Sequence, residues 1–189
     1  MAAQFPVNLN LAGRRVLVVG AGRIALRKTE QLLVADALVT VVAPDVHAGF
    51  ADLPVTVLRD VFAPAHLEGQ RLVITATGVR DVDQEIFDLC ESRGIWVNSA
   101  DDPERCTFTL PAVHRQGSVM VTVSTGGASP ALSSYLRAQI AELVGPEYAD
   151  IAAELAAERA NVHARGASTE DIDWRPIIER VLVSHGVPR

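Results

Sequence analysis

Five short apolar runs follow one another through the first hundred residues. Several of them, such as RVLVV and LVITA, are apolar at almost every position and rich in β-branched side chains. A strand with this pattern is buried on both faces, which is typical of parallel sheets. The predicted strands are residues 15–19, 38–43, 55–58, 72–76 and 95–98.

Helical spacing fills two of the gaps between these strands. Residues 23–34 and 82–93 each place apolar side chains along one face, and Gly94 is a natural end for the second helix. Strands and helices that alternate with short connections predict a doubly wound α/β unit. We therefore expect a Rossmann-like parallel sheet domain over residues 1–112.

The pattern changes after this domain. Residues 118–124 alternate cleanly, as a half-buried strand does, and residues 131–144 have a helical spacing that begins after Ser129 and Pro130. The apolar face of that helix would hold Leu132, Leu136, Ile140 and Leu143. Two more helices are predicted at residues 148–164 and 173–184, so a small α+β region leads into a helical C-terminal tail.

Charge and composition exclude several classes of function. The net charge of -6 argues against non-specific binding to nucleic acid or to a membrane surface. No apolar run approaches the roughly 20 residues of a membrane span, and the first residues lack a signal peptide pattern, so we expect a cytoplasmic protein. The two cysteines form no CxxC motif, and the histidines show no metal-binding spacing, so no structural metal site is expected.

The segment Gly20-Ala21-Gly22-Arg23-Ile24-Ala25 lies between the first strand and the first helix. In a GxGxxA turn, the first glycine allows a tight turn and the second lets the backbone approach a pyrophosphate. The helix N-terminus then offers amide donors to the anion. The sequence therefore predicts a dinucleotide site here.

The end of the second strand suggests which dinucleotide binds. An acidic side chain at this place holds the ribose hydroxyls in many such domains, and here Asp45 follows Ala43 and Pro44. No arginine follows directly to receive a 2′-phosphate. We therefore expect NAD rather than NADP.

Two further turns follow strands and face the same edge of the predicted sheet. Thr77 and Gly78 either let the backbone pass close to the cofactor or form an ordinary turn. Asp101 and Asp102 follow the fifth strand, where a carboxylate could act as a general acid or base. Asp102 precedes Pro103 and is expected to start a turn, which leaves Asp101 as the catalytic candidate.

The second region also contains polar candidates. The hydroxyl- and glycine-rich loop that begins Ser124-Thr125-Gly126 is either an anion-binding loop or a plain N-capped turn. His114 and Arg115 could pair with substrate carboxylates, although a histidine in such a place is more often structural. Cys106 has no sequence cue for a base and is expected to be a small buried residue.

Several of these segments together resemble the precorrin-2 dehydrogenase family, which includes the N-terminal half of siroheme synthases. The resemblance covers roughly residues 5–145 in the same order and spacing. It is carried by the FPV motif at residues 5–7 with Leu9, and by VLVVGAGRIALRK, VTVVAP, VNSADDPERCTFTLPA and VTVSTGGASPALS, which begin at residues 16, 39, 97 and 121.

This resemblance implies an oxidation of precorrin-2 to sirohydrochlorin with NAD, by a homodimer whose partner chains complete each active site. The family's essential aspartate falls on Asp101, and its nucleotide contacts fall on Gly20, Ala21, Gly22, Arg23, Ile24, Pro44 and Asp45. Residues 113–147 match its dimerisation region, and residues 148–189 form a helical C-terminal region. The substrate carboxylates would be held by Arg105, His114 and Arg115, and by the loop of Ser124, Thr125 and Gly126.

Two points depart from the family or stay open. Asp36 stands where the family usually has glycine, so we expect a left-handed backbone and a small loss of stability there. The chain stops at Arg189, so a stand-alone dehydrogenase is expected rather than a fusion with a methyltransferase. The alternatives are a bifunctional dehydrogenase and ferrochelatase, or a non-catalytic NAD-binding, redox-sensing dimer.

Overall fold

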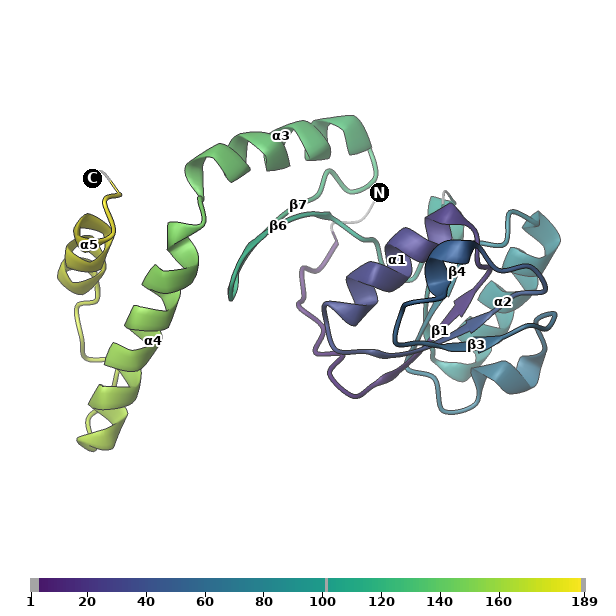
Figure 1. Ribbon diagram of the computed structural model, residues 1–189, viewed down its shortest axis with the longest axis horizontal. Helices are drawn as coiled ribbons and strands as arrows, with labels where there is room; N and C mark the ends of the chain where they lie inside the picture. The colour runs from purple at the N-terminus through teal and green to yellow at the C-terminus, as the bar shows by residue number, and fades with distance from the viewer. Residues whose placement is uncertain (1–3, 101, 188–189) are drawn as a thin grey trace. The chain divides into compact units, whose positions relative to one another are not determined.

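The computed structural model describes residues 4–100 and 102–187 (Figure 1). The chain divides into two compact units, Met1–Thr109 and Leu110–Arg189. The first unit holds a parallel five-stranded sheet in the order β3-β2-β1-β4-β5. Its elements are β1 (Arg15–Val19), α1 (Arg23–Leu33), β2 (Leu38–Val42), β3 (Thr56–Leu58), β4 (Leu72–Thr75), α2 (Arg80–Arg93) and β5 (Trp96–Ser99).

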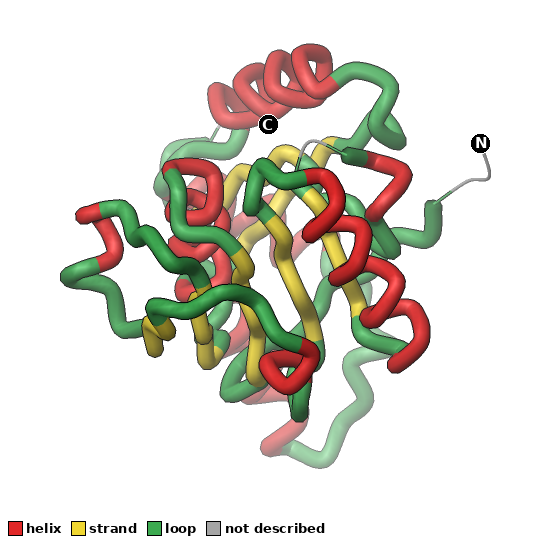
Figure 2. Tube along the Cα trace, turned by 90° about the vertical axis from the view of Figure 1, so that its right-hand side faces the viewer, coloured by secondary structure: helices red, strands yellow, loops and turns green. Residues whose placement is uncertain are grey.

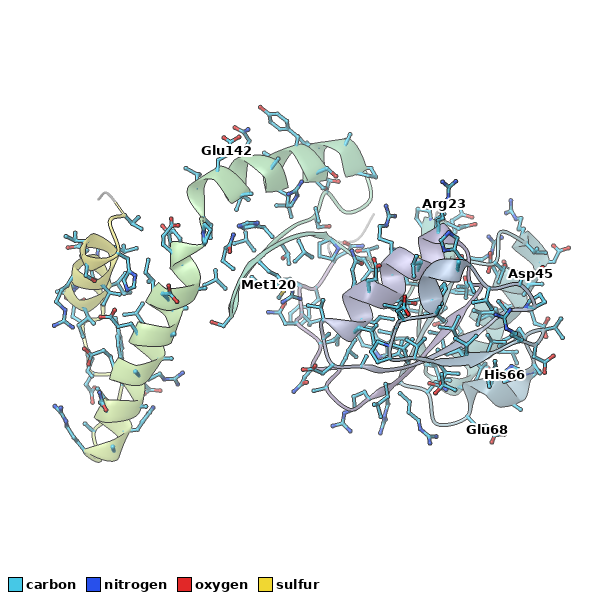
Figure 3. The ribbon with its side chains drawn as sticks, viewed as in Figure 1. Arg23, Asp45, His66, Glu68, Met120 and Glu142 are labelled. Atoms are coloured by element: carbon cyan, nitrogen blue, oxygen red, sulfur yellow. The ribbon has the colours of Figure 1, made fainter. Side chains whose placement is uncertain are left out.

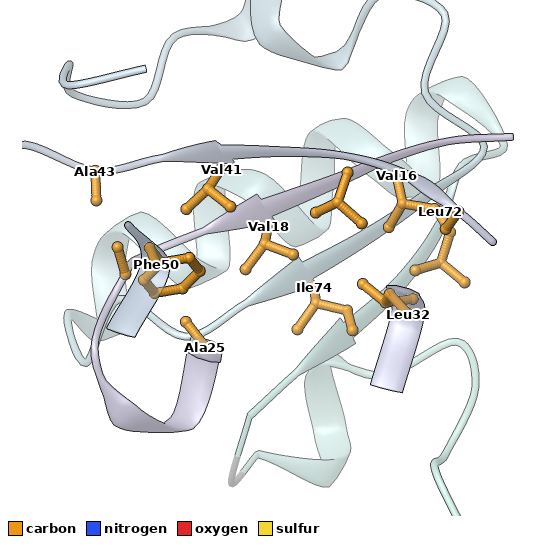
Figure 4. Packing of buried hydrophobic residues seen from close by; sticks show 12 residues of the cluster. Val16, Val18, Ala25, Leu32, Val41, Ala43, Phe50, Leu72 and Ile74 are labelled. Atoms are coloured by element: carbon orange, nitrogen blue, oxygen red, sulfur yellow. The ribbon is translucent and has the colours of Figure 1, made fainter. Parts of the chain in front are cut away.

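The apolar runs form strands because both faces of the sheet are covered. On β1, Val16 and Val18 pack into a core with α1, while Leu17 and Val19 pack into a second core with α2. All four side chains are at most 2% exposed. Figure 2 shows the strands side by side with helices flanking them, and Figure 4 shows the core that includes Ala25 of α1. The expected Rossmann-like architecture is confirmed.

The connections on one side of the sheet are shorter than those of a regular α/β unit. The connection from β2 to β3 contains the 3₁₀ turn η1 (Ala48–Phe50), the connection from β3 to β4 contains η2 (Pro64–Leu67), and a third turn, η3 (Pro103–Arg105), follows β5. These turns leave no periodic signal in the sequence because each is a single turn long.

The second unit contains a β-hairpin and three helices. The hairpin pairs β6 (Ala112–Gln116) with β7 (Val119–Val123), and α3 (Pro130–Leu143), α4 (Glu147–Ala164) and α5 (Arg175–Ser184) follow. The alternating residues 118–124 predict β7, whereas β6 reads AVHRQ and carries too few apolar residues to be recognised. Ser129 caps α3 through a bond from the Leu132 amide (3.2 Å), as the Ser-Pro pair predicts.

None of the helices in residues 4–100 and 102–187 has the length and apolar character that a membrane crossing requires.

Asp36 adopts the left-handed conformation expected of it, with φ of 55°. It closes the turn between α1 and β2, where the Gly13 amide donates to its carbonyl (2.9 Å). An exposed aspartate in this conformation is mildly strained, whereas glycine is not. We expect Asp36→Gly to raise the free energy of unfolding by about 0.5 kcal/mol, because relief of strain outweighs the added freedom of the unfolded chain.

The matched change is Asp36→Ala, which keeps the Cβ atom and loses the polar side chain that tolerates this conformation. It should lower the free energy of unfolding by about 1 kcal/mol. Urea titrations of the three proteins check the order. A glycine variant less stable than the native chain would contradict the assignment of strain.

Candidate functional site

The turns that follow β1, β2, β4 and β5 meet at one edge of the sheet. Parallel strands bring their carboxyl ends together, and ligands of open α/β sheets bind at this edge. Four backbone hydrogen bonds tie the turns to their neighbours here. They run from Gly20 N to Val42 O (2.9 Å), from Ala76 N to Val19 O (2.8 Å), from Ala100 N to Thr75 O (2.8 Å) and from His47 N to Ala21 O (3.0 Å).

The two glycines of the turn after β1 have different roles. Gly20 has φ of 98°, and a Cβ atom there would lie 2.3 Å from the carbonyl oxygen of Ala76, so only glycine fits. Gly22 has an ordinary φ of -82°, and a Cβ atom there would meet nothing within 4 Å. The backbone at Gly22 is therefore open to a ligand at the point where α1 begins.

The other residues of this turn separate into buried and exposed positions. Ala21 and Ala25 are buried, and Ala25 packs in the core beneath the helix, as the small third position of the motif requires. Arg23 and Ile24 are exposed in the first turn of α1, where Figure 3 labels Arg23. The first turn of α1 thus exposes backbone amides and the Arg23 guanidinium to a ligand that lies at Gly22.

The segment after β2 runs beside the glycine turn. The bond from His47 N to Ala21 O holds it there, and Pro44 and Asp45 are both exposed. Figure 3 labels Asp45. His47 begins η1, and its Nδ1 accepts a hydrogen bond from the Gly49 amide (3.1 Å). An exposed carboxylate close to the glycine turn is suitably placed for the hydroxyls of a nucleotide ribose.

The turn after β4 uses one of its two predicted residues internally. The Thr77 hydroxyl donates to the Asp83 carboxylate (2.8 Å) and accepts from the Val79 amide (3.0 Å). Gly78 is exposed, with φ of 72° and open space where a Cβ atom would be. Gly78 therefore leaves room for a cofactor, while the Thr77 hydroxyl fixes the start of α2.

The turn after β5 carries the acidic pair. Asp101 lies outside the described residues, but both of its neighbours are placed. Ala100 is tied to Thr75 of β4, and Asp102 caps η3 by accepting from the Glu104 amide (3.1 Å). Asp102 therefore starts a turn, as its position before Pro103 predicts.

Neither thiol in the chain has the environment of a nucleophile. Burial raises the pKa of the Cys90 thiol to about 11, so it stays protonated at neutral pH. Burial also raises the pKa of Cys106, whose sulfur contacts the Asn98 side chain (3.3 Å) and the Asp102 carbonyl (3.2 Å). Both cysteines have packing roles, and among the described residues no three acidic, histidine or cysteine side chains gather as metal ligands do.

Arg105 points into the protein rather than to solvent. It is 7% exposed, its guanidinium pairs with the Asp102 carboxylate, and its Nε donates to Gln84 Oε1 of α2 (2.7 Å). The contact of Gln84 with Arg105 could not be predicted from the sequence, because a glutamine on a helix carries no sign that it binds a buried arginine.

The loop between β7 and α3 is closed by its own hydroxyl groups. Thr125 Oγ1 accepts from the Ser129 amide (3.0 Å) and lies 3.2 Å from the Ser133 hydroxyl, while Ser124 Oγ accepts from the Gly126 amide (3.1 Å). This is the geometry of an N-capped turn. Anion binding by the same loop stays a prediction.

The two basic candidates of β6 differ in exposure. His114 Nε2 lies 2.7 Å from the Val144 carbonyl oxygen at the end of α3, so this ring joins the hairpin to the helix. Arg115, its neighbour, is exposed. Strand β6 thus carries an exposed guanidinium next to a structural histidine.

Two family models match the chain. One carries the description "Putative NAD(P)-binding" and covers residues 7–112, which include the whole parallel sheet. The other is described as "Sirohaem biosynthesis protein central" and covers residues 116–143, from the end of β6 through α3.

Curated relatives and a solved structure extend these matches. The siroheme synthase of Nitrosomonas eutropha is 37% identical over 172 residues, which are 88% of this chain and 36% of that protein. The siroheme synthase of Thiobacillus denitrificans is 40% identical over 83% of this chain and 34% of its own length. The chain thus spans about a third of the length of these relatives.

The structure of SirC, a precorrin-2 dehydrogenase, superposes with a TM-score of 0.74 over 97% of this chain and 99% of that one, at 24% identity. This likeness confirms the fold. The glycine turn, the open backbone at Gly22 and the exposed Asp45 lie within residues 7–112. Because that family model covers more than half of the chain, this protein belongs to the NAD(P)-binding family that it describes.

Proposed function

We propose that this protein oxidises precorrin-2 to sirohydrochlorin with NAD as the hydride acceptor. The observation that carries the proposal is that the turn after β5 begins beside the end of β4, at the carboxyl edge of the sheet. The bond from Ala100 N to Thr75 O (2.8 Å) holds this turn at the end of β4. The next residue after Thr75 is Ala76, whose carbonyl group packs against Gly20 in the glycine turn. Relatives named siroheme synthase and a structural neighbour named precorrin-2 dehydrogenase support the choice of substrate.

The cofactor would lie along the carboxyl edge of the sheet. The amides at the start of α1 would face the pyrophosphate at Gly22, and Asp45 would hold the ribose hydroxyls. Gly78 would allow the dinucleotide to pass close to the backbone. A carboxylate at position 45 repels a 2′-phosphate, so NAD is preferred to NADP. The proposed contact set is Gly20, Ala21, Gly22, Arg23, Ile24, Pro44, Asp45, Thr77 and Gly78.

The chemistry needs one acceptor for a hydride and one for a proton. The dehydrogenation breaks two bonds to hydrogen in the substrate, and bound NAD supplies the hydride acceptor. Asp101 is the proposed general base, because it directly follows Ala100, which is tied to Thr75 at the end of β4, and ligands of such sheets bind at this edge. NADH, one proton and sirohydrochlorin are the products, so atoms and electrons balance.

The substrate carries several carboxylates, whereas the chain has a net charge of -6. Binding therefore needs positive charge concentrated locally. Arg115 is the exposed guanidinium on β6, and His114 stands beside it. The proposed substrate contacts are these two residues and the loop of Ser124, Thr125 and Gly126. Arg105, the third basic candidate, is engaged by Asp102 and Gln84 inside the protein and is not among the proposed contacts.

The direct test is turnover. Purified protein incubated with precorrin-2 and NAD should form sirohydrochlorin and NADH in equal amounts, both followed by absorbance. Binding of NAD without any turnover would reject the dehydrogenase and favour a non-catalytic NAD-binding role. A second reaction, with sirohydrochlorin and ferrous or cobaltous ion but no NAD, tests the bifunctional alternative that the siroheme synthase relatives suggest.

We also propose that the protein works as a homodimer in the cytoplasm, built on the second unit. The two-stranded hairpin packs on α3 and has no further strand beside it among the described residues, so its outer strand edges are unpaired there. Helix α3 exposes several large apolar side chains on its outer surface, which favours a second copy as the partner. The exposed side chains are Leu132 (47%), Tyr135 (62%), Leu136 (39%) and Leu143 (74%).

Light scattering should give a mass of about twice the chain. Leu136→Asp, which adds a charge to the apolar surface of α3, should yield a monomer. Val34→Asp is the matched control, because Val34 is 68% exposed on the first unit and should keep the dimer. A native chain that is monomeric at micromolar concentration would contradict the proposal.

A further inference from the structure

Arg105 is a buried cation beside the turn that carries Asp101. Its guanidinium pairs with the Asp102 carboxylate and donates through Nε to Gln84 Oε1 (2.7 Å), with 7% of the residue exposed. Burying a guanidinium is costly unless it is paired and hydrogen-bonded, and both conditions are met here. The side chain thus joins the turn after β5 to helix α2.

Gln84, the residue of α2 that accepts from Arg105, is itself held in place. Gln84 Nε2 donates to the Asp88 carboxylate one helical turn further on (2.8 Å), so the amide presents its oxygen to Arg105. The helix packs on the sheet through Ile86 and Cys90, which are fully buried. Asp88, Gln84, Arg105 and Asp102 therefore form one continuous chain of polar contacts with a rigid base.

The same turn is closed from within. The Cys106 sulfur lies 3.4 Å from the Ser99 carbonyl and 3.2 Å from the Asp102 carbonyl, and Asp102 accepts from the Glu104 amide (3.1 Å). On the other side, Ala100 is tied to Thr75 of β4. Ala100 and Asp102 are thus each held in place by contacts to the rest of the first unit.

We propose that Arg105 is a positioning residue, which holds Asp102 against Gln84 and so fixes the turn from which Asp101 acts on the substrate. This inference rests on the proposed function and differs from direct contact between Arg105 and a substrate carboxylate. The guanidinium is engaged inside the protein by two side chains, one of them on a helix with no proposed substrate contact.

Kinetics separate the two roles. If Arg105 positions the turn, Arg105→Met and Gln84→Met should both lower kcat, by about 10- to 100-fold for the arginine, because small displacements of a catalytic group are costly. The KM for precorrin-2 and the Kd for NAD should change less than about twofold. Arg105→Lys should recover only part of kcat, since an ammonium lacks the planar fork.

The two substitutions should also be non-additive. The double variant Arg105→Met/Gln84→Met should be about as slow as Arg105→Met alone, because the residues act as one unit. If instead Arg105→Met raises KM while Gln84→Met leaves both constants unchanged, Arg105 contacts the substrate and the proposal is overturned.

Hydrogen exchange provides a readout that needs no turnover. Amides of residues 97–106 should exchange faster in Arg105→Met and Gln84→Met, while amides of β1 and α1 keep their native rates. Arg93→Met is the matched control: it makes the same arginine-to-methionine change on α2, the helix that carries Gln84. The exposed Arg93 guanidinium donates to the Pro64 carbonyl (2.9 Å), so residues 97–106 should be unaffected.

Native exchange rates at residues 97–106 in both variants would overturn the proposal whether or not the native protein oxidises precorrin-2. If the native protein shows no turnover, the proposed function fails and exchange alone decides the positioning of the turn. If Arg105→Met does not fold, Gln84→Met, which leaves the buried pair of Arg105 and Asp102 in place, supplies the result.

Discussion

Gly22→Asp should fold normally and lose NAD binding by at least about 100-fold, because a negative charge in the anion site costs several kcal/mol. The backbone at Gly22 has an ordinary φ, and a side chain there meets open space. Gly22 is also the N-cap of α1, a position that aspartate favours. The substitution should therefore leave the fold intact while it prevents the pyrophosphate of NAD from binding. Isothermal calorimetry with NAD measures the loss.

Gly22→Asn separates charge from size in this experiment. Asparagine has nearly the same shape and also caps helices, so its smaller loss of affinity reports the steric part alone. Gly20→Ala tests the neighbouring glycine and should instead destabilise the fold, because its Cβ atom would lie 2.3 Å from the Ala76 oxygen. Unchanged NAD affinity in Gly22→Asp would reject the assignment of the turn. Equal affinities for NAD and NADP would reject the preference at Asp45.

The parallel sheet was predictable because burial on both faces leaves an unambiguous pattern. The run at residues 15–19 coincides with β1 to the residue, and the other predicted strands differ from those observed by one residue or so at an end. The backbone conformations that favour glycine were partly predictable as well. The end of α2 at Gly94 follows from backbone sterics, which are local and can be seen in a sequence. The left-handed φ of Asp36 was expected because the family that the chain resembles usually has glycine there.

Features that depend on tertiary partners were not predictable. Strand β6 forms because its backbone pairs with β7, and its own residues, AVHRQ, do not favour a strand by pattern. The inward direction of Arg105 depends on Gln84, which is 21 residues away in the chain. The boundary expected at residue 112 rests on the alternation of strands and helices, and the one at residue 147 rests on the family resemblance. Both remain predictions beside the two units observed.

Asp101→Ala should fold, bind NAD with native affinity and oxidise precorrin-2 about 10²- to 10⁴-fold more slowly, which is the usual loss on removal of a general base. Asp101→Asn should lose nearly as much, because the amide keeps the shape of the side chain but cannot take the proton. Single-turnover absorbance with saturating NAD measures the chemical step directly. Calorimetry with NAD serves as the control for folding and cofactor binding.

Asp102→Asn is the comparison that makes this prediction specific to one carboxylate. It keeps one oxygen for the Glu104 amide and replaces the oxygen that accepts from Arg105 with an NH₂ group, so the ion pair and its hydrogen bond are lost together. Its effect should come through displacement of the turn, so kcat should fall about tenfold, well short of the loss at position 101. If the Asp102 variant is inactive while the Asp101 variant keeps the native rate, the general base is Asp102 and not Asp101. Two variants of native rate would show that neither carboxylate takes the proton, and that substrate and NAD react through their placement alone.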